Sequence, residues 1–153
     1  MIRKSCLLLC FAMLAAAVLT SPIASIAGDS EKAVADCVSH EMAAFSSNDR
    51  EAFVSTYTDA PTIVDDVKPF AWSNAGGWFD AVRPRFRQVT MTPSAPLEVL
   101  IDGNHAFIAV PFTIVGVSGK GAHFKAGGYW TGALVLTGGH SWRIASAAIT
   151  LTE

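Results

Sequence analysis

The stretch from residue 105 to residue 151, HAFIAVPFTIVGVSGKGAHFKAGGYWTGALVLTGGHSWRIASAAITL, decides the fold. It contains three long runs rich in β-branched and aromatic residues, at 105–117, 122–137 and 141–151, with short glycine-bearing turns between them. Turns this short leave no room for a crossover helix, so consecutive runs must pair as hairpins. The stretch therefore predicts long antiparallel strands.

The length of these strands predicts curvature. The first two runs have about 13 and 16 residues, well above the usual five or six, and they contain Pro111 and the pair Gly127-Gly128. Proline and glycine inside a strand mark bulges or bends. Two shorter strands, at 89–92 and 97–101, precede them behind their own turns. We expect one antiparallel sheet that curls strongly.

Helical spacing dominates the region before the sheet. A first helix opening at Asp29 carries apolar residues at intervals of three and four, namely Val34, Val38, Met42 and Phe45. Asn48, with Glu51 three residues later, predicts the cap of a second, shorter helix that includes Phe53 and Tyr57 one turn apart.

The chain then alternates between a strand and a helix. Residues 62–65 are expected to form a short strand, with 70–72 pairing back on it. Ser73 or Asn74 can cap a third helix that contains Trp78 and ends near Pro84. The predicted class is α+β: three N-terminal helices packed on a strongly curved antiparallel sheet, a cystatin-like cone with a cavity between the layers.

The N-terminus has the layout of a secretory signal peptide. Arg3 and Lys4 are followed by an uncharged, largely apolar segment, and small residues stand at Ser25 and Ala27. We expect cleavage after Ala27, so that 1–27 is the signal peptide and 28–153 is one domain that is periplasmic or secreted and not stably inserted in a membrane. The alternative is that the segment is retained as a membrane anchor. Removing 27 of 153 residues leaves 126.

Charge and cysteine content narrow the possible partners. The predicted mature part has nine Lys and Arg against thirteen Asp and Glu, a formal charge of about −4. This balance argues against nucleic acid and anionic membranes as partners. Only Cys37 lies outside the signal peptide, so no disulfide can form within the mature chain, and Cys37 is expected to be a small buried residue of the first helix.

Five features in this order resemble a known family. They are Asn48-Asp49 between the first helices, the strand Thr62-Ile63-Val64-Asp65, the segment Pro69-Phe70-Ala71-Trp72-Ser73, Trp78 on the third helix, and the closing Ser141-Trp142-Arg143-Ile144-Ala145. The chain resembles a SnoaL-like member of the nuclear transport factor 2-like superfamily. This superfamily includes isomerases, polyketide cyclases, dehydratases and binding modules, so the resemblance is more specific for fold than for function.

Asp65 is the candidate catalytic residue. A carboxylate that ends an apolar strand at a cavity is partly desolvated, which makes it a better proton acceptor. In ketosteroid isomerase-like members the catalytic aspartate lies at this strand end, sixteen residues after an aspartate that opens the second helix, as Asp65 follows Asp49. The alternative is that Asp65 and Asp66 are polar turn residues. The polarising groups of those isomerases are missing, because Glu41 and Gly132 stand at their positions, which argues against steroid isomerisation.

Further pocket residues are expected from residue type. We predict that Trp72, Trp78, Tyr57, Glu41 and Tyr129 contact a small, largely apolar ligand. The four histidines are scattered without the spacing of a preformed metal site, so no metal and no cofactor are expected. The arginines at 83, 85 and 87 are expected to be solvated near the end of the third helix.

Two functions remain open from the sequence. One is a small-molecule enzyme, an isomerase, cyclase or dehydratase that uses Asp65 as general base. The other is a non-catalytic ligand-binding or dimerisation module of the cell envelope, in which two subunits pair through the exposed face of the sheet.

Overall fold

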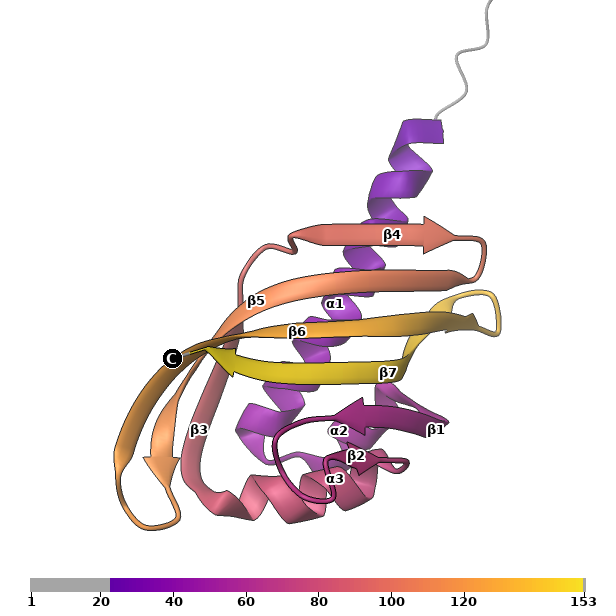
Figure 1. Cartoon of the computed structure of the whole chain (residues 1–153). Helices are drawn as coiled ribbons and strands as arrows, with labels where there is room; N and C mark the ends of the chain where they lie inside the picture. Colours follow the sequence, from indigo (N-terminus) through magenta and orange to yellow (C-terminus); the bar gives the residue numbers. More distant parts are fainter. Residues whose placement is uncertain (1–22, 153) are drawn as a thin grey trace, which may run out of the picture.

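The computed structural model describes residues 23–152, which form a layer of helices against the inner face of a curled seven-stranded sheet (Figure 1). Most of the predicted signal peptide lies outside these residues. The first helix, α1 (Ile23–Ser47), already runs across the predicted cleavage point after Ala27. Among the described helices, none combines the length and the apolarity needed to cross a membrane.

Helix α1 packs on the sheet with the predicted apolar face, since Val34, Val38, Met42 and Phe45 are all buried. The next helix, α2 (Arg50–Ser55), is capped by Asp49, whose side chain accepts a hydrogen bond from the Ala52 N–H at 2.9 Å. The predicted cap at Asn48 is therefore wrong by one residue. Asn48 instead turns the chain between the two helices with a φ of 62°, a left-handed conformation that asparagine tolerates.

Strand β1 (Tyr57–Val64) begins five residues earlier than predicted. Tyr57 was expected on the second helix, one turn after Phe53, but it pairs with Ile144 at the far end of the chain. Helical spacing over a single turn is weak evidence, and this tertiary pairing overrides it. Strand β2 (Ala71–Trp72) pairs antiparallel with Ile63 and Val64, which confirms the predicted short hairpin.

Helix α3 (Ala75–Val82) is capped by Asn74, which accepts from the Gly77 N–H at 3.0 Å, as predicted. It passes at Pro84 into a 3₁₀ turn, η1 (Arg83–Arg85). Arg83 is buried, contrary to the expectation that it is solvated. It donates to the carbonyls of Phe45 at 2.8 Å and Phe86 at 3.0 Å. The last carbonyls of α1 lack partners within the helix, and Arg83 satisfies one of them.

The remaining strands are β3 (Phe86–Pro93), β4 (Glu98–Asp102), β5 (His105–Ser118), β6 (His123–Thr137) and β7 (Ser141–Thr152). The long strands β5, β6 and β7 start and end within one residue of the prediction. The order is β2-β1-β7-β6-β5-β3, and β4 pairs with the first half of β5. Because β1 lies parallel to β7, the sheet is mixed, which corrects the expectation of a wholly antiparallel sheet.

The glycine pair in β6 serves packing rather than a bulge. The β5–β6 register runs without interruption through Gly127 and Gly128. A Cβ atom at Gly128 would lie 2.8 Å from Cζ of Phe112, so the missing side chain lets the Phe112 ring lie flat on the inner face of the sheet. This places an aromatic ring at the concave side, where the candidate site lies.

Candidate functional site

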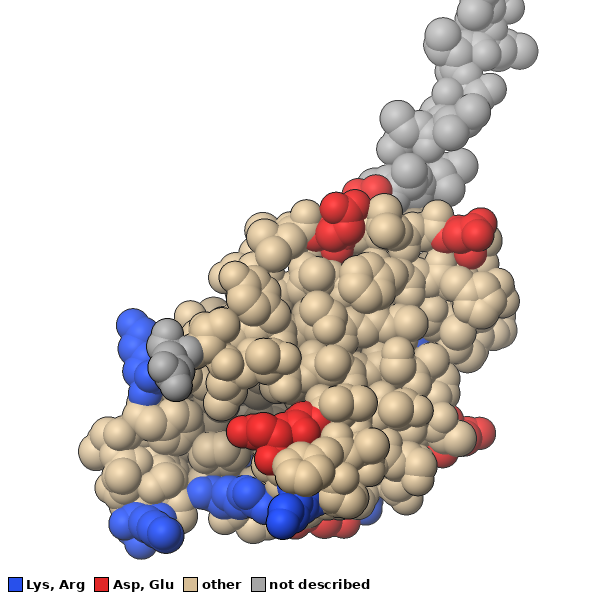
Figure 2. All heavy atoms as spheres, viewed as in Figure 1, with Lys and Arg blue, Asp and Glu red and all other residues tan. Residues whose placement is uncertain are grey.

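A cavity of about 340 Å³ lies between α3 and the concave face of the sheet. Its apolar wall comes from both layers and includes Phe45, Trp78, Met91, Phe112 and Ile114. Four polar side chains also line the cavity. Asp65 and Asp66 come from the segment after β1, Arg85 from η1 and Ser118 from the end of β5. Figure 2, drawn in the same view as Figure 1, shows a hollow in the lower half of the molecule, with acidic and basic side chains beside it.

Asp65 is held in this cavity by two hydrogen bonds. Its Oδ1 accepts from the Val67 N–H at 2.7 Å, and its Oδ2 accepts from the indole N–H of Trp78. The side chain is only half-buried, so the cavity keeps it in contact with solvent or a ligand. Each carboxylate oxygen has a second lone pair. Asp65 therefore serves the turn, and its carboxylate is held in a fixed orientation at the cavity wall with lone pairs left over.

Trp78 is in turn fixed by other aromatic rings. It stacks on Phe53 with ring centroids 5.4 Å apart and planes inclined by 13°, and Phe45 lies 5.4 Å away on a tilted ring. Offset and tilted pairs of this kind are the favoured aromatic contacts. The structure thus brings together Asp65 and Trp78, two of the predicted site residues, on a rigid support.

Arg85 is a residue of this cavity that the sequence did not single out. The sequence placed it in a solvated basic cluster, and it is indeed exposed, but it also lines the cavity with Asp65. Its Nε donates to the Ala81 carbonyl at 3.3 Å, and its terminal guanidinium nitrogens make no hydrogen bond within the described residues. The position of η1 against the end of β5 could not be derived from local sequence, because it depends on how α3 packs.

Glu41 and Tyr57 are also brought together, but they do not line this cavity. Both are buried between α1 and β1, and the Tyr57 hydroxyl donates to Oε1 of Glu41 at 3.0 Å. Oε2 of Glu41 has no hydrogen-bond partner among the described residues. Burial raises the pKa of Glu41 to about 8, and the hydrogen bond from the Tyr57 hydroxyl only partly opposes this rise. Glu41 is therefore a neutral acid at pH 7.

The other two predicted ligand contacts lie away from the cavity. Tyr129 is 44% exposed, and its neighbour Trp130 is fully buried, so strand alternation directs Tyr129 to the outer face of the sheet. The expectation that Tyr129 meets a ligand in the cavity is corrected on this ground. Trp72 packs half-buried on β2 against the core and is not among the residues that line the cavity.

Within residues 23–152, no group of three or more His, Cys, Asp or Glu side chains is arranged to hold a metal ion. The chemistry of the cavity rests on two carboxylates, a guanidinium, a hydroxyl and an apolar wall. Such a set can bind an apolar molecule, accept a proton from it and stabilise a developing negative charge.

No protein-family model matches the sequence, and no curated protein matches it significantly. Solved structures show that the fold is that of nuclear transport factor 2-like proteins. A member of this superfamily from Salmonella enterica superposes with a TM-score of 0.73 at 11% identity, over 83% of this chain and 94% of that one.

Two further structures share the fold. A ketosteroid isomerase-like protein from Erwinia carotovora superposes with a TM-score of 0.72 at 17% identity, over 82% of this chain and 98% of that chain. The structure of LinA gives a TM-score of 0.75 at 11% identity, over 83% and 88%. A second LinA structure is described as a hexachlorocyclohexane dehydrochlorinase. At these identities the likeness concerns the fold alone.

Proposed function

We propose that this protein binds a small, largely apolar molecule in the cavity between α3 and the sheet, and that Asp65 removes a proton from it. The single observation that carries the proposal is the placement of the Asp65 carboxylate, held by Val67 and Trp78, in an apolar cavity. A volume of about 340 Å³ suits a molecule of one or two rings.

The position of Arg85 favours a proton-transfer reaction over passive binding of the ligand. Removing a proton from carbon leaves negative charge on the substrate, and a guanidinium in the same cavity can stabilise that charge. The substrate class is therefore an apolar molecule with a C–H bond next to an electron-withdrawing group such as a carbonyl. Isomerisation, cyclisation and dehydration all begin with this step. The isomerase-like and dehydrochlorinase names among the structural neighbours are compatible with it.

Passive binding is the second candidate. The hydrogen bond from the Val67 N–H to Asp65 favours it, since this bond also serves the turn without any reaction. Both candidates require an accessible cavity, and only the first requires the charge of Asp65.

Occupancy of the cavity can be measured with N-phenyl-1-naphthylamine, a neutral aromatic dye whose fluorescence rises in apolar surroundings. We expect it to bind with one molecule per chain, because the cavity offers one apolar site of suitable size beside Trp78. Binding at several weak sites, or no binding, would count against the proposal.

We also propose that the protein is exported, on the signal-peptide pattern of residues 1–27. A periplasmic or secreted location requires cleavage, so the mass of the protein recovered outside the cytoplasm should correspond to a chain beginning at Gly28. Recovery of the full-length chain in the cytoplasm alone would contradict export.

A homodimer through the outer face of the sheet is proposed as the assembled state. Val64, Phe107 and Tyr129 are exposed apolar residues, and Val64 and Phe107 border a shallow recess of about 240 Å³ formed by small residues of β6 and β7. Figure 2 shows that the sheet face seen in Figure 1 is largely free of charge. A two-fold axis would place Phe107 of each subunit against the recess of the other.

We therefore expect sedimentation equilibrium to give the mass of two chains. Phe107→Glu should yield a single chain, because it places a charge in the apolar contact, whereas Leu97→Glu, at another exposed apolar residue, should remain a dimer. A single-chain mass for the unaltered protein would exclude the dimer.

A further inference from the structure

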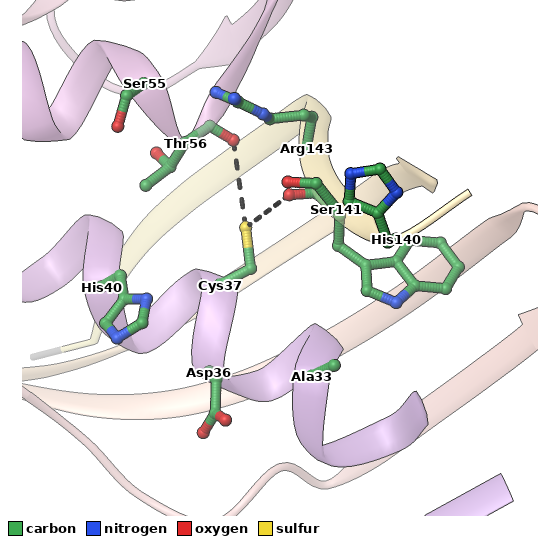
Figure 3. Close-up of a pocket in the computed structure, with 10 residues that line it drawn as sticks. Ala33, Asp36, Cys37, His40, Ser55, Thr56, His140, Ser141 and Arg143 are labelled. Carbon is green, nitrogen blue, oxygen red and sulfur yellow. Dashed lines mark hydrogen bonds between the residues drawn. The ribbon is translucent and has the colours of Figure 1, made fainter. Parts of the chain in front are cut away.

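A second depression, of about 380 Å³, lies on the other side of α1 (Figure 3). It is bordered by α1, by the end of α2 and by the turn between β6 and β7. Its polar lining includes His40 from α1, Ser55 at the end of α2, Thr56 directly after it, and His140 and Arg143 from the turn and β7. It shares no lining residue with the cavity that contains Asp65.

Arg143 is the cation of this depression. It is half-buried, and within residues 23–152 it has neither a hydrogen bond nor a carboxylate at ion-pair distance. The only carboxylate on the rim, Asp36, is bonded to Lys32. In Figure 3 Asp36 extends away from the centre, while the guanidinium of Arg143 lies over Thr56 on the opposite side. A half-buried guanidinium without a partner favours an anion as its ligand.

The floor of the depression does not repel an anion. Cys37 lies at its centre, with Sγ 3.4 Å from the Trp142 carbonyl and 3.9 Å from the Thr56 carbonyl (Figure 3). Burial raises the pKa of this thiol to about 12, so the sulfur carries no charge at neutral pH. The thiol is a neutral donor with one hydrogen, and the Trp142 carbonyl is the nearer of its two acceptors.

The depression continues along the helices. A neighbouring hollow of about 480 Å³ between α1 and α2 shares His40, Ser55 and Thr56 with it. The rest of that hollow is lined mainly by alanine methyl groups, from Ala43, Ala44 and Ala52, together with Ser47. The two hollows form one trough, with Arg143 at one end and an apolar surface at the other.

We propose that this trough binds a small amphipathic anion, with a carboxylate or phosphate at Arg143 and a short alkyl chain along the alanines of α1 and α2. The guanidinium supplies charge-assisted hydrogen bonds, and the imidazoles and hydroxyls of the rim supply further donors. The alanine-lined end suits a short alkyl chain, and the hydroxyl of Ser47 there already donates to the Ala44 carbonyl at 3.2 Å. The trough is a site separate from the Asp65 cavity.

The test is an amide NMR titration of the full mature protein with hexanoate, hexyl phosphate and hexanol. We expect both anions to shift the signals of residues 36–44, 55–56 and 140–143, and hexanol to bind at least tenfold more weakly. Whichever of the two anions binds with the higher affinity identifies the head group as a carboxylate or a phosphate. Equal binding of hexanol, or shifts confined to the Asp65 cavity, would overturn the proposal.

Two variants and one control sharpen this test. Arg143→Gln should weaken hexanoate at least tenfold, while Arg87→Gln, at an exposed arginine outside the trough, should leave it unchanged. Ala43→Trp fills the apolar end from an exposed helix position, so it should weaken hexanoate without affecting acetate even if Arg143→Gln fails to fold. Unchanged hexanoate affinity in Ala43→Trp or in folded Arg143→Gln would contradict the site. Either result leaves the dye-binding test of the Asp65 cavity unaffected.

Discussion

Replacing Glu41 by glutamine is expected to remove most of the loss of stability that the protein undergoes as the pH rises from about 4.5 to about 8. Glu41 is buried beside Tyr57, and burial raises its pKa from the ordinary value of 4.5 to about 8. In this pH interval the folded protein keeps the proton of Glu41, while the unfolded chain releases it. The free energy of unfolding therefore falls as the pH rises, and it stops falling above about 8.

The size of the effect follows from the pKa difference. One pKa unit corresponds to about 1.36 kcal/mol, so the full interval amounts to a loss of about 5 kcal/mol. Glutamine has nearly the same shape and stays neutral at every pH, and it can still accept from the Tyr57 hydroxyl. We expect Glu41→Gln to match the wild type near pH 4 and to exceed it by several kcal/mol at pH 8.

Urea unfolding at a series of pH values measures this difference. Glu31→Gln is the matched control, since Glu31 lies on the same helix but is exposed, and its removal should leave the pH dependence as it is. If Glu41→Gln keeps the wild-type slope between pH 4.5 and 8, Glu41 is not the neutral acid described above.

Replacing Asp65 by asparagine is expected to reduce catalysed proton exchange by about 10²- to 10⁴-fold, the usual contribution of a general base. Asparagine keeps the size of the side chain and can still accept one hydrogen bond, but it cannot take up a proton. The assay follows deuterium exchange at the carbon next to the carbonyl of small cyclic ketones by NMR. The wild type should accelerate this exchange over buffer for ketones that fit the cavity.

Asp66→Asn is the control for this variant. Asp66 is adjacent, lines the same cavity and loses the same charge, but it makes no hydrogen bond to Trp78. We expect its exchange rate to stay within a few-fold of the wild type. Equal rates for Asp65→Asn and the wild type would leave passive binding as the function of the cavity.

The sequence predicted the late strands well and the start and strand direction of β1 poorly, for a physical reason. The turns around Gly103, Gly119 and Gly138 are local signals, and they fix β5, β6 and β7 within a residue. The start of β1 depends on Tyr57 pairing with Ile144, which no local pattern reveals. The same pairing makes the sheet mixed, so the error in β1 and the error in strand direction have one cause.

For the candidate site too, features with a local sequence signal were predicted, and features that depend on tertiary packing were not. Asp65 could be placed at the cavity because it ends a clearly marked strand, and Trp78 because it is a large aromatic residue on the clearly marked third helix. The approach of Arg85 to the cavity and the inward direction of Phe112 depend on the packing of α3 and on the space above Gly128. Glu41 and Tyr57 were expected in the pocket, and the structure pairs them with each other beneath it.

We expect the space beside Asp65 to hold an apolar molecule, and dye binding to two tryptophan variants measures this most directly. Leu151 and Leu100 are both exposed leucines, 49% and 56% accessible, but only Leu151 lines the cavity. We predict that Leu151→Trp fills the opening and weakens N-phenyl-1-naphthylamine at least tenfold, while Leu100→Trp binds it like the wild type. Equal binding of the dye to both variants would show that it does not bind beside Asp65.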